Sequence, residues 1–342
     1  MNTRIDKLLS KAPEYMLISD IDNMYYLSGF TGDNGVLVLG RDRQVLITDS
    51  RYTGQAEKEC PGFEIRDYAG GHMLSPAADI VGSAPCGFEA DSVSLRTYRD
   101  ICERIEDPVE THGLTEALRL IKDPSETEAV RKACRLADRA AEWLREYIRP
   151  GMTEREVALD LEYYMKKRGA SETAFPSIIA AGPNAAYPHH APTDAVIEEG
   201  QMVKCDFGCR LDHYNSDITR TFFVGEPDPE FRRIYDIVLE AQLRAIEAIR
   251  PGKTGREIDK TARDVIAAAG YGDRFGHSLG HGLGLSVHDS AAFAPSSPVT
   301  LEPGIIATVE PGIYIPGWGG IRTEDDILVT EDGCEVLTHA EK

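Results

Sequence analysis

The chain has little positive charge and no long apolar run. Its 342 residues include 37 lysines and arginines against 57 aspartates and glutamates, which gives a formal net charge of −20. Such a surface repels the phosphate backbone of nucleic acids and anionic membranes, so neither is expected as a partner. No stretch approaches the roughly 20 apolar residues of a membrane span, and the first residues lack the apolar centre of a signal peptide. These absences predict a soluble, cytoplasmic protein.

The cysteines are odd in number and form neither a metal-binding nor a disulfide pattern. The seven cysteines are scattered, and none belongs to a C-x-x-C pair, which fits reduced thiols in a cytosolic protein. Cys205 and Cys209 flank Asp206, but no second pair of cysteines or histidines accompanies them at a zinc-site spacing. We therefore interpret both as small buried hydrophobic residues.

The length and the pattern of apolar runs predict two domains. A chain of 342 residues exceeds what one hydrophobic core usually serves. Up to residue 120, short apolar runs alternate with helix-like segments, which is typical of a small α/β domain. The expected strands are Tyr15–Ser19, Gly35–Leu39, Val45–Thr48 and Gly87–Ala90, and the expected helices are Tyr52–Cys60 and Leu95–Ile105.

The chain changes character at Lys122-Asp123-Pro124. Asp123 can cap a helix with Pro124 in its first position, and apolar residues then recur at helical spacing from Glu126 to Ile148. We place the domain boundary just before this helix. The expected domains are residues 1–121, in which we find no acid-base cluster, and residues 122–342.

The second domain contains an internal repeat. The segment Ile148–Val157, IRPGMTEREV, recurs as Ile249–Ile258, IRPGKTGREI, at an offset of 101 residues. In each copy a helix ends at Pro-Gly, and a threonine opens the next helix with a glutamate three residues later, the pattern of a capping box. Chance is the alternative, but histidines and a strand-turn-strand segment follow both copies. The repeat therefore predicts a pseudo-two-fold domain with its site in the crease.

The segment Gln201–Gly225 is typical of a β-hairpin, and it carries two carboxylates. A turn centred on Leu211-Asp212 would place Asp206 opposite Asp217, with Cβ atoms about 4.5–5.5 Å apart. Half-buried carboxylates at that distance repel each other unless protons or a metal ion lie between them. A solvated hairpin with both aspartates facing water is the alternative for this segment taken alone.

A second hairpin offers two more carboxylates. It consists of Ile305–Glu310 and Ile321–Thr330, which carry Glu310 and Glu324 and are joined by the turn-rich PGIYIPGWGG. His281, in GHGLG, supplies a nitrogen. Four carboxylates in one crease are prohibitive unless two divalent cations balance their charge. Oxygen ligands with one imidazole suit Mn²⁺, Co²⁺ or Fe²⁺, with Zn²⁺ as an alternative, and two such ions can support hydrolysis.

These motifs together resemble a known family. The residues H-x-x-P-T-D, C-D-F-G, N-S-D-I-T-R-T, G-H-G-L-G, V-E-P-G and R-T-E-D-D, in this order, resemble the M24 metallopeptidases, which have the pita-bread fold. Tyr26–Phe30 and Thr48–Tyr52 resemble the amino-terminal domain of Xaa-Pro peptidases and creatinase. The resemblance covers the whole chain. It implies a creatinase-like α/β domain at residues 1–121 and a pseudo-two-fold pita-bread catalytic domain at residues 122–342.

The resemblance also implies a set of metal ligands. Asp206 would bind one of two divalent metal ions, and Asp217 and Glu324 would bridge both. His281 and Glu310 would bind the other ion. Glu310 would also exchange protons with the bridging water and with the leaving amine.

Further residues would handle the substrate. The resemblance implies that His189 and His288 hold the peptide and the developing oxyanion, whereas the adjacent His190 is expected to be a bystander. Arg322 is expected to brace Glu324 or the metal-bound carboxylates, with a plain surface arginine as the alternative.

The segment around His281 raises two structural expectations. His288 lies seven residues after His281, which would put the two on opposite faces of a straight strand, so the chain must leave the strand for both to reach the site. The run Gly280–Gly284 superficially resembles a nucleotide-binding loop but does not match G-x-G-x-x-G. We expect its glycines to give the backbone room near a metal ligand.

The segment after His288 departs from the family and bears on the substrate. Family members usually have His-Glu-x-Pro there, whereas this chain has His288-Asp289-Ser290-Ala291. Prolidases commonly bind the free carboxylate of a dipeptide with an arginine shortly after that histidine, but residues 289–304 contain no Arg or Lys. This favours an Xaa-Pro aminopeptidase, which releases the residue before proline, over an Xaa-Pro dipeptidase (prolidase).

Two alternatives lie outside this chemistry. Creatinase-like amidine hydrolysis uses the fold without metal, and the complete ligand set argues against it. A pita-bread binding protein without catalysis should lack ligands. The resemblance implies proline-containing peptides as substrates, two divalent metal ions with Mn²⁺ as the first choice, and a homodimer.

Overall fold

The computed structural model describes residues 3–289 and 293–342, and the chain divides into two compact units, Met1–Arg119 and Leu120–Lys342. Each unit has its own apolar core. Among the described residues, no helix combines the length and the apolar character needed to cross a membrane.

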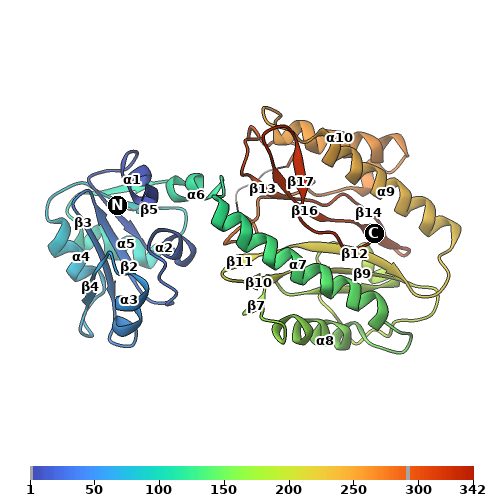
Figure 1. Ribbon diagram of the computed structural model, residues 1–342, viewed down its shortest axis with the longest axis horizontal. Helices are drawn as coiled ribbons and strands as arrows, with labels where there is room; N and C mark the ends of the chain where they lie inside the picture. Colours follow the sequence, from blue (N-terminus) through green and yellow to red (C-terminus); the bar gives the residue numbers. More distant parts are fainter. Residues whose placement is uncertain (1–2, 290–292) are drawn as a thin grey trace. The chain divides into compact units, whose positions relative to one another are not determined.

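The first unit is built on a mixed six-stranded sheet with short helices (Figure 1). In the order across the sheet, its strands are β4 (Glu64–Asp67), β3 (Arg43–Thr48), β2 (Val36–Gly40), β1 (Tyr15–Ile18), β5 (Cys86–Glu89) and β6 (Pro108–Thr111). Its helices are α1 (Thr3–Leu9), α2 (Ile21–Ser28), α3 (Thr53–Glu59), α4 (Leu74–Val81), α5 (Leu95–Arg104) and α6 (Leu114–Arg119). The apolar runs of the sequence form β1, β2, β3 and β5, whose Leu17, Val38, Val45 and Phe88 share one core. The expected α/β character of this part of the chain is confirmed.

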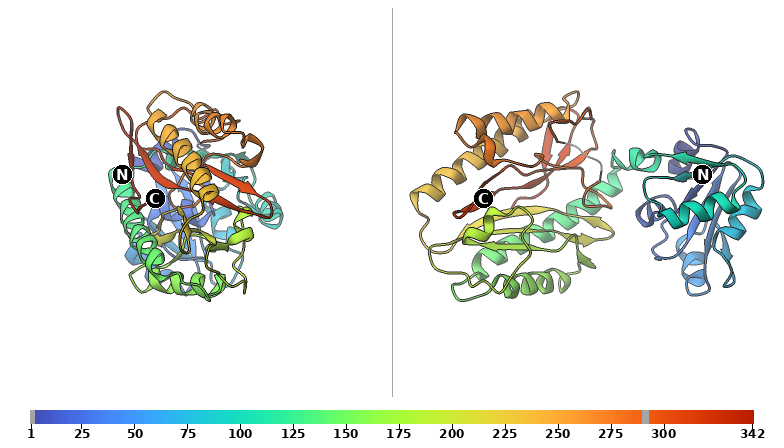
Figure 2. Two further views of the ribbon diagram at one scale, coloured as in Figure 1. Left: turned by 90° about the vertical axis from the view of Figure 1, so that its right-hand side faces the viewer. Right: turned by 180° about the vertical axis from the view of Figure 1, so that it is seen from behind.

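Four long helices frame the second unit. They are α7 (Pro124–Tyr147), α8 (Glu154–Lys166), α9 (Pro229–Ala248) and α10 (Gly255–Ala268). Asp123 caps α7, and Thr153 and Thr254 open α8 and α10, each in a capping box as the sequence predicts. Helices α7 and α8 lie on one side of the strands, and α9 and α10 lie on the other (Figures 1 and 2).

The strands of the second unit follow the two copies of the repeat. The first group is β7 (Glu172–Thr173), β8 (Ile178–Ala181), β9 (Met202–Phe207), β10 (Cys209–Leu211), β11 (Tyr214–Asn215) and β12 (Ile218–Phe223). The second group is β13 (Ile306–Val309), β14 (Gly312–Ile315), β15 (Gly319–Arg322), β16 (Asp325–Val329) and β17 (Cys334–Val336). The 3-10 helices η1 (Gly182–Ala186) and η2 (Gly272–Arg274) lie in the connections. Each group packs mainly against its own helix pair, which agrees with the pseudo-two-fold prediction.

The first hairpin forms, but its register differs from the prediction. Asp206 pairs with Thr219, and not with Asp217. The turn is centred one residue later than expected, on Asp212 and His213, whose φ angles are 49° and 69°. Positive φ at both central residues matches the twist of the flanking strands, so turn geometry decides the register. Because the pairing moves by two residues, Asp217 stays on the same face as Asp206.

The second hairpin is longer than predicted. Strand β13 pairs with β16, and the expected turn-rich connection forms a hairpin of its own in which β14 pairs with β15. The pairs on either side share one register, which places Glu310 opposite Glu324. A glycine permits close packing here, because a Cβ atom at Gly320 would lie 2.2 Å from the carbonyl oxygen of Ala185.

Candidate metal centre

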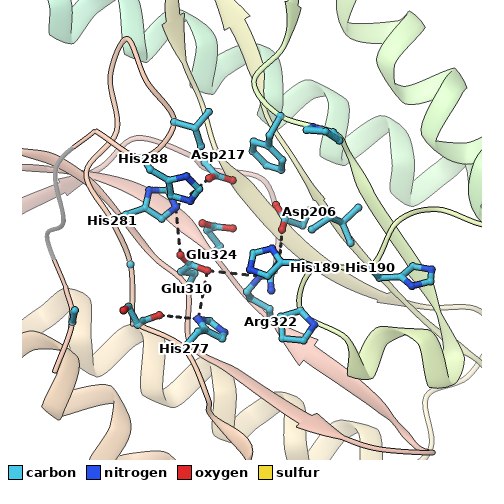
Figure 3. A pocket seen from close by; sticks show the side chains of 18 residues that line it. His189, His190, Asp206, Asp217, His277, His281, His288, Glu310, Arg322 and Glu324 are labelled. Atoms are coloured by element: carbon cyan, nitrogen blue, oxygen red, sulfur yellow. Dashed lines mark hydrogen bonds and ion pairs between the residues drawn. The ribbon is translucent and has the colours of Figure 1, made fainter. Parts of the chain in front are cut away.

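A cavity of about 510 Å³ opens in the second unit and is lined by both halves of the repeat. Every site residue named from the sequence lines it, and so does His190 (Figure 3). The apolar part of its wall consists of Phe175, Pro176, Ile178, Pro188, Val287 and Ala294. The cavity therefore joins a cluster of charged groups to an apolar surface, a combination typical of a small-molecule or peptide site.

Asp217, His281 and Glu324 form the centre of the cluster. Each offers one ligand atom, and these atoms lie within 4.8 Å of one another. The Nε2 atom of His281 lies 3.6 Å from Oδ2 of Asp217 and 3.5 Å from Oε1 of Glu310. Asp206 lies beside them on β9, so the five predicted ligands surround one space.

Arg322 ties the carboxylates together. Its guanidinium pairs with Asp206 and lies 4.0 Å from Oε2 of Glu310. Its Nε atom donates to Oγ1 of Thr219 at 3.0 Å, and that hydroxyl donates to Oε2 of Glu324 at 2.5 Å. Arg322 is buried, which rules out the alternative of a plain surface arginine. It reaches Glu324 through Thr219 rather than directly.

Burial makes the ionised carboxylates unfavourable without a nearby cation. It raises the pKa of Glu310 to about 8. Burial, followed by repulsion from neighbouring carboxylates, also raises the pKa of Asp217 and of Glu324 well above the usual range. Burial and the neighbouring His288 lower the pKa of His281 to about 4, which keeps its imidazole neutral and able to act as a ligand.

The residues fit divalent metal ions. The Oδ1 atoms of Asp206 and Asp217 are buried and, within the part of the chain that the structure describes, accept no hydrogen bond. Buried oxygens normally have a bonding partner, so these two atoms indicate a partner that the protein itself does not supply. Carboxylate oxygens with a single imidazole suit Mn²⁺ and related ions better than a thiolate site would.

Two histidines contributed by one irregular segment meet at the cluster. The rings of His281 and His288 are 4.2 Å apart between centroids, so both reach the site and the chain has left a strand between them, as predicted. The glycine run gives the backbone room, because a Cβ atom at Gly280 would lie 2.0 Å from the carbonyl oxygen of Thr308.

His189 and His190 lie on the opposite side of the cavity. Both line it, although Figure 3 shows His190 farther from the carboxylates. The Nε2 atom of His190 lies 2.8 Å from the buried carboxylate of Glu154. His190 thus forms part of the cavity wall through its contact with Glu154, and its lack of a catalytic role stays a prediction.

Two residues near the cluster escaped the sequence reasoning. His277 lines the cavity, and its Nε2 atom is 2.8 Å from the hydroxyl of Tyr314. That hydroxyl also accepts a hydrogen bond from Nη1 of Arg322 at 2.8 Å. The four-residue spacing between His277 and His281 was the available signal, whereas Tyr314 lies in a segment that looked like a plain turn.

The segment after His288 is described in part. Asp289 is buried, and its carboxylate lies 3.5 Å from the Nζ atom of Lys122. Ser290 and Ala291, the rest of the departure from the family pattern, lie outside the described residues.

Comparisons with known proteins give the family of both parts of the chain. Residues 128–331 match the model of metallopeptidase family M24, and residues 4–121 match the creatinase/prolidase N-terminal domain. An Xaa-Pro dipeptidase of Pyrococcus furiosus is 38% identical over 100% of this chain and 99% of its own length.

Two solved structures are also similar. An Xaa-Pro dipeptidase from Bacillus anthracis has a TM-score of 0.97 at 43% identity, covering 99% of this chain and 98% of its own. An X-Pro aminopeptidase from Thermotoga maritima has a TM-score of 0.91 at 38% identity, with the same coverage of both chains. The predicted fold, a creatinase-like domain followed by a pita-bread domain, is confirmed.

Proposed function

Since the chain belongs to metallopeptidase family M24, which makes it a hydrolase, we propose that it is an Xaa-Pro aminopeptidase. It would release the residue that precedes proline from proline-containing peptides. The observation that carries this proposal is the buried cluster of Asp217, His281 and Glu324, with ligand atoms within 4.8 Å of one another, beside an apolar wall.

The family implies divalent metal ions, and we propose two of them with Mn²⁺ as the first choice. Asp206 would hold one ion, and His281 and Glu310 the other. Asp217 and Glu324 would contact both. When bound, such ions supply Lewis acidity that activates water and polarises a carbonyl group.

The side chains of the site would transfer the proton and hold the substrate. Glu310 takes a proton from the attacking water and passes it to the nitrogen of the leaving proline. The oxygen of the water adds to the carbonyl carbon first, and the bond between that carbon and the nitrogen then breaks as the nitrogen takes the proton. His189 and His288 hold the peptide and the negative oxygen that develops, and Arg322 keeps Asp206 and Glu310 in place.

We propose a preference for longer peptides because the cavity offers no uncommitted arginine or lysine among its described lining residues. Among its described lining residues, Arg322 is the single Arg or Lys, and its guanidinium already contacts Asp206, Thr219 and Tyr314. The free carboxylate of an Xaa-Pro dipeptide would therefore meet no uncommitted arginine or lysine side chain among these residues. The alternative is an Xaa-Pro dipeptidase, which similarity to the dipeptidase of Bacillus anthracis favours.

The first test compares matched substrates. The protein is stripped with a chelator, refilled with Mn²⁺, Co²⁺ or Zn²⁺, and assayed on an Xaa-Pro dipeptide and the corresponding Xaa-Pro-Xaa tripeptide. Cleavage of the tripeptide alone supports the aminopeptidase, whereas cleavage of the dipeptide alone supports the prolidase. No metal-dependent cleavage of either would overturn the Xaa-Pro assignment.

A single substitution tests the proposed ligands. Asp217→Asn removes one charge from a residue proposed to contact both ions, so hydrolysis should be lost while far-UV circular dichroism stays unchanged. Retained activity in this variant would refute the ligand assignment.

We also propose a cytoplasmic homodimer. All seven cysteines are free, which supports a reducing compartment. Sedimentation velocity at micromolar concentration checks the dimer, and a monomeric species would contradict it.

A further inference from the structure

One irregular segment forms the side of the cavity opposite His281 and His288. It runs from η1 through Pro188, His189 and His190 to Thr193, and these two histidines and Pro188 line the cavity. Beyond η1 this stretch contains no helix or strand, so hydrogen bonds from other elements must fix its conformation.

Glu154 holds both ends of this segment. The residue opens α8, and its side chain is fully buried. Its Oε1 atom accepts hydrogen bonds from the backbone nitrogen of Ala181 at 2.8 Å and from Nδ2 of Asn184 at 2.9 Å. Its Oε2 atom accepts from Nε2 of His190 at 2.8 Å and from the nitrogen and hydroxyl of Thr193 at 2.9 and 2.7 Å.

Five hydrogen-bond donors around the Glu154 carboxylate favour its ionised form. Burial alone would raise the pKa of Glu154, but the hydrogen bonds that it accepts outweigh burial and lower it. A carboxylate can satisfy all five donors, whereas an amide can accept through one oxygen and must turn its NH₂ group toward the others. The site is therefore built for a negative charge.

Lys204 holds the middle of the same segment. It lies on β9 two residues before Asp206, so the two side chains share one face of the strand. Lys204 is fully buried. Its Nζ atom donates to the carbonyl oxygens of Tyr187 at 2.7 Å and Ala185 at 3.1 Å, and lies 3.5 Å from that of Pro188.

We propose that Glu154 and Lys204 are positioning residues, which fix the segment Gly182–Thr193 and thereby aim His189 at the substrate. His189 stands directly between Pro188, on the Lys204 side, and His190, on the Glu154 side. Lys204 also ties this wall to the strand that carries Asp206. The inference rests on the proposed role of His189 in holding the peptide.

These contacts act on the substrate through His189, and those of Glu154 involve none of the five proposed ligands. Loss of the Glu154 contacts should therefore weaken catalysis but not metal binding. A misplacement of about 1 Å at a catalytic group can cost about 10²-fold in rate, so Glu154→Gln and Lys204→Met should each lower kcat/KM by about 10- to 100-fold. Glu154→Asp should restore part of the loss because it keeps the charge.

The decisive test is a cycle with His189→Ala. If Glu154 acts through His189, then Glu154→Gln should change kcat/KM by less than about threefold in the His189→Ala background. Fully additive losses would overturn the proposal, since they would show an effect independent of His189.

Two further measurements do not require activity. Hydrogen exchange should speed up in residues 182–193 of Glu154→Gln and Lys204→Met, while the Mn²⁺ affinity of Glu154→Gln by calorimetry stays within about twofold of the parent. Unchanged hydrogen exchange in this segment would overturn the proposal that Glu154 and Lys204 fix its conformation. If the parent chain cleaves no Xaa-Pro peptide, the proposed function fails, but hydrogen exchange still decides whether Glu154 and Lys204 fix the segment.

Glu156→Gln is the matched control. Glu156 lies on the same helix turn, is exposed, and accepts hydrogen bonds from Thr153 in the capping box. Its replacement should cost some helix stability without altering exchange in residues 182–193 or kcat/KM. If Glu154→Gln does not fold, Lys204→Met, which replaces one long side chain by another, carries the same comparison.

Discussion

At the scale of single residues, Arg322 organises the charges around the candidate metal centre. It contacts Asp206, Thr219, Tyr314 and Glu310, and so connects side chains from both halves of the repeat. The sequence indicated that Arg322 braces Glu324 or the metal-bound carboxylates, but it did not identify Thr219 and Tyr314 as partners. Hydrogen bonds between distant strands depend on register, which the local pattern left uncertain.

Substitution of Arg322 should reduce activity without unfolding the chain. Loss of a partner that orients metal ligands typically costs about 10- to 100-fold in metal affinity or activity, and we expect a loss of this size for Arg322→Met. Arg322→Lys should lose nearly as much, because an ammonium group cannot serve three partners in a planar fork. Kinetics and Mn²⁺ calorimetry check this, and full activity in Arg322→Lys would contradict it.

The carboxylates make the stability of the metal-free protein depend on pH. Burial raises the pKa of Glu310 from 4.5 to about 8 in the folded chain, so the folded form binds the proton more tightly than the unfolded form. The stabilisation is present below pH 4.5 and is lost as pH rises towards 8. Burial lowers the pKa of His277 to about 3 and of His281 to about 4, which acts in the opposite direction, so the carboxylate effect is read from the difference in Tm between the chelated and the metal-loaded protein.

The same experiment with Mn²⁺ supplies the control. Bound cations stabilise the ionised carboxylates, so metal should raise Tm more at pH 8 than at pH 5. Burial also raises the pKa of Glu89 in the first unit to about 7, but its contribution is common to both forms and cancels in their difference. A metal-induced rise in Tm that is equal at both pH values would contradict this prediction.

At the scale of elements, capping and close packing were readable from the sequence, and strand register was not. The capping boxes at Thr153 and Thr254 form as predicted because they depend on residues within one turn. The register of the first hairpin differs from the prediction because the turn is centred on Asp212 and His213, which adopt positive φ angles. The extra hairpin β14–β15 was missed because its strands are short and contain glycines.

The close approach at Gly280 gives an element-scale prediction. A Cβ atom there would lie 2.0 Å from the backbone oxygen of Thr308, which cannot move without disturbing β13. Gly280→Ala should therefore destabilise the protein by about 1–3 kcal/mol and displace His281. Urea denaturation and Mn²⁺ titration measure the two effects.

Gly276 is the comparison position. A Cβ atom at Gly276 would meet no other atom within 4 Å, so Gly276→Ala should be nearly neutral in both measurements. Equal losses in the two variants would show that the segment tolerates no substitution, and would remove close packing as the cause.

At the scale of the whole second unit, a buried ion pair joins the two halves beside the candidate metal centre. Arg220, on β12, pairs with Asp325, on β16, at 2.8 Å, and both side chains are buried. Arg220 also donates to the backbone oxygens of Glu324 and Ala340. The sequence placed these residues beside recognised motifs, but their pairing depends on the packing of segments about a hundred residues apart.

Breaking this pair should be costly. Removing one partner of a buried pair typically costs about 3–5 kcal/mol, and because Asp325 keeps Lys342 at 2.6 Å we expect a loss at the lower end, about 3 kcal/mol, for Arg220→Met. The exposed pair Arg244–Glu240 is the control, where Arg244→Met should cost less than about 0.5 kcal/mol. Urea denaturation of the metal-loaded protein compares them, and similar midpoints for both variants would contradict the prediction.

The proposed ligands lie in two parts of the chain that are synthesised at different times. Asp206 and Asp217 leave the ribosome before His281, Glu310 and Glu324. At about 5–20 residues per second, the first hairpin waits roughly ten seconds for its counterpart. An emerging chain therefore holds no complete ligand set, and hydrolytic activity can begin only after the second hairpin has been made.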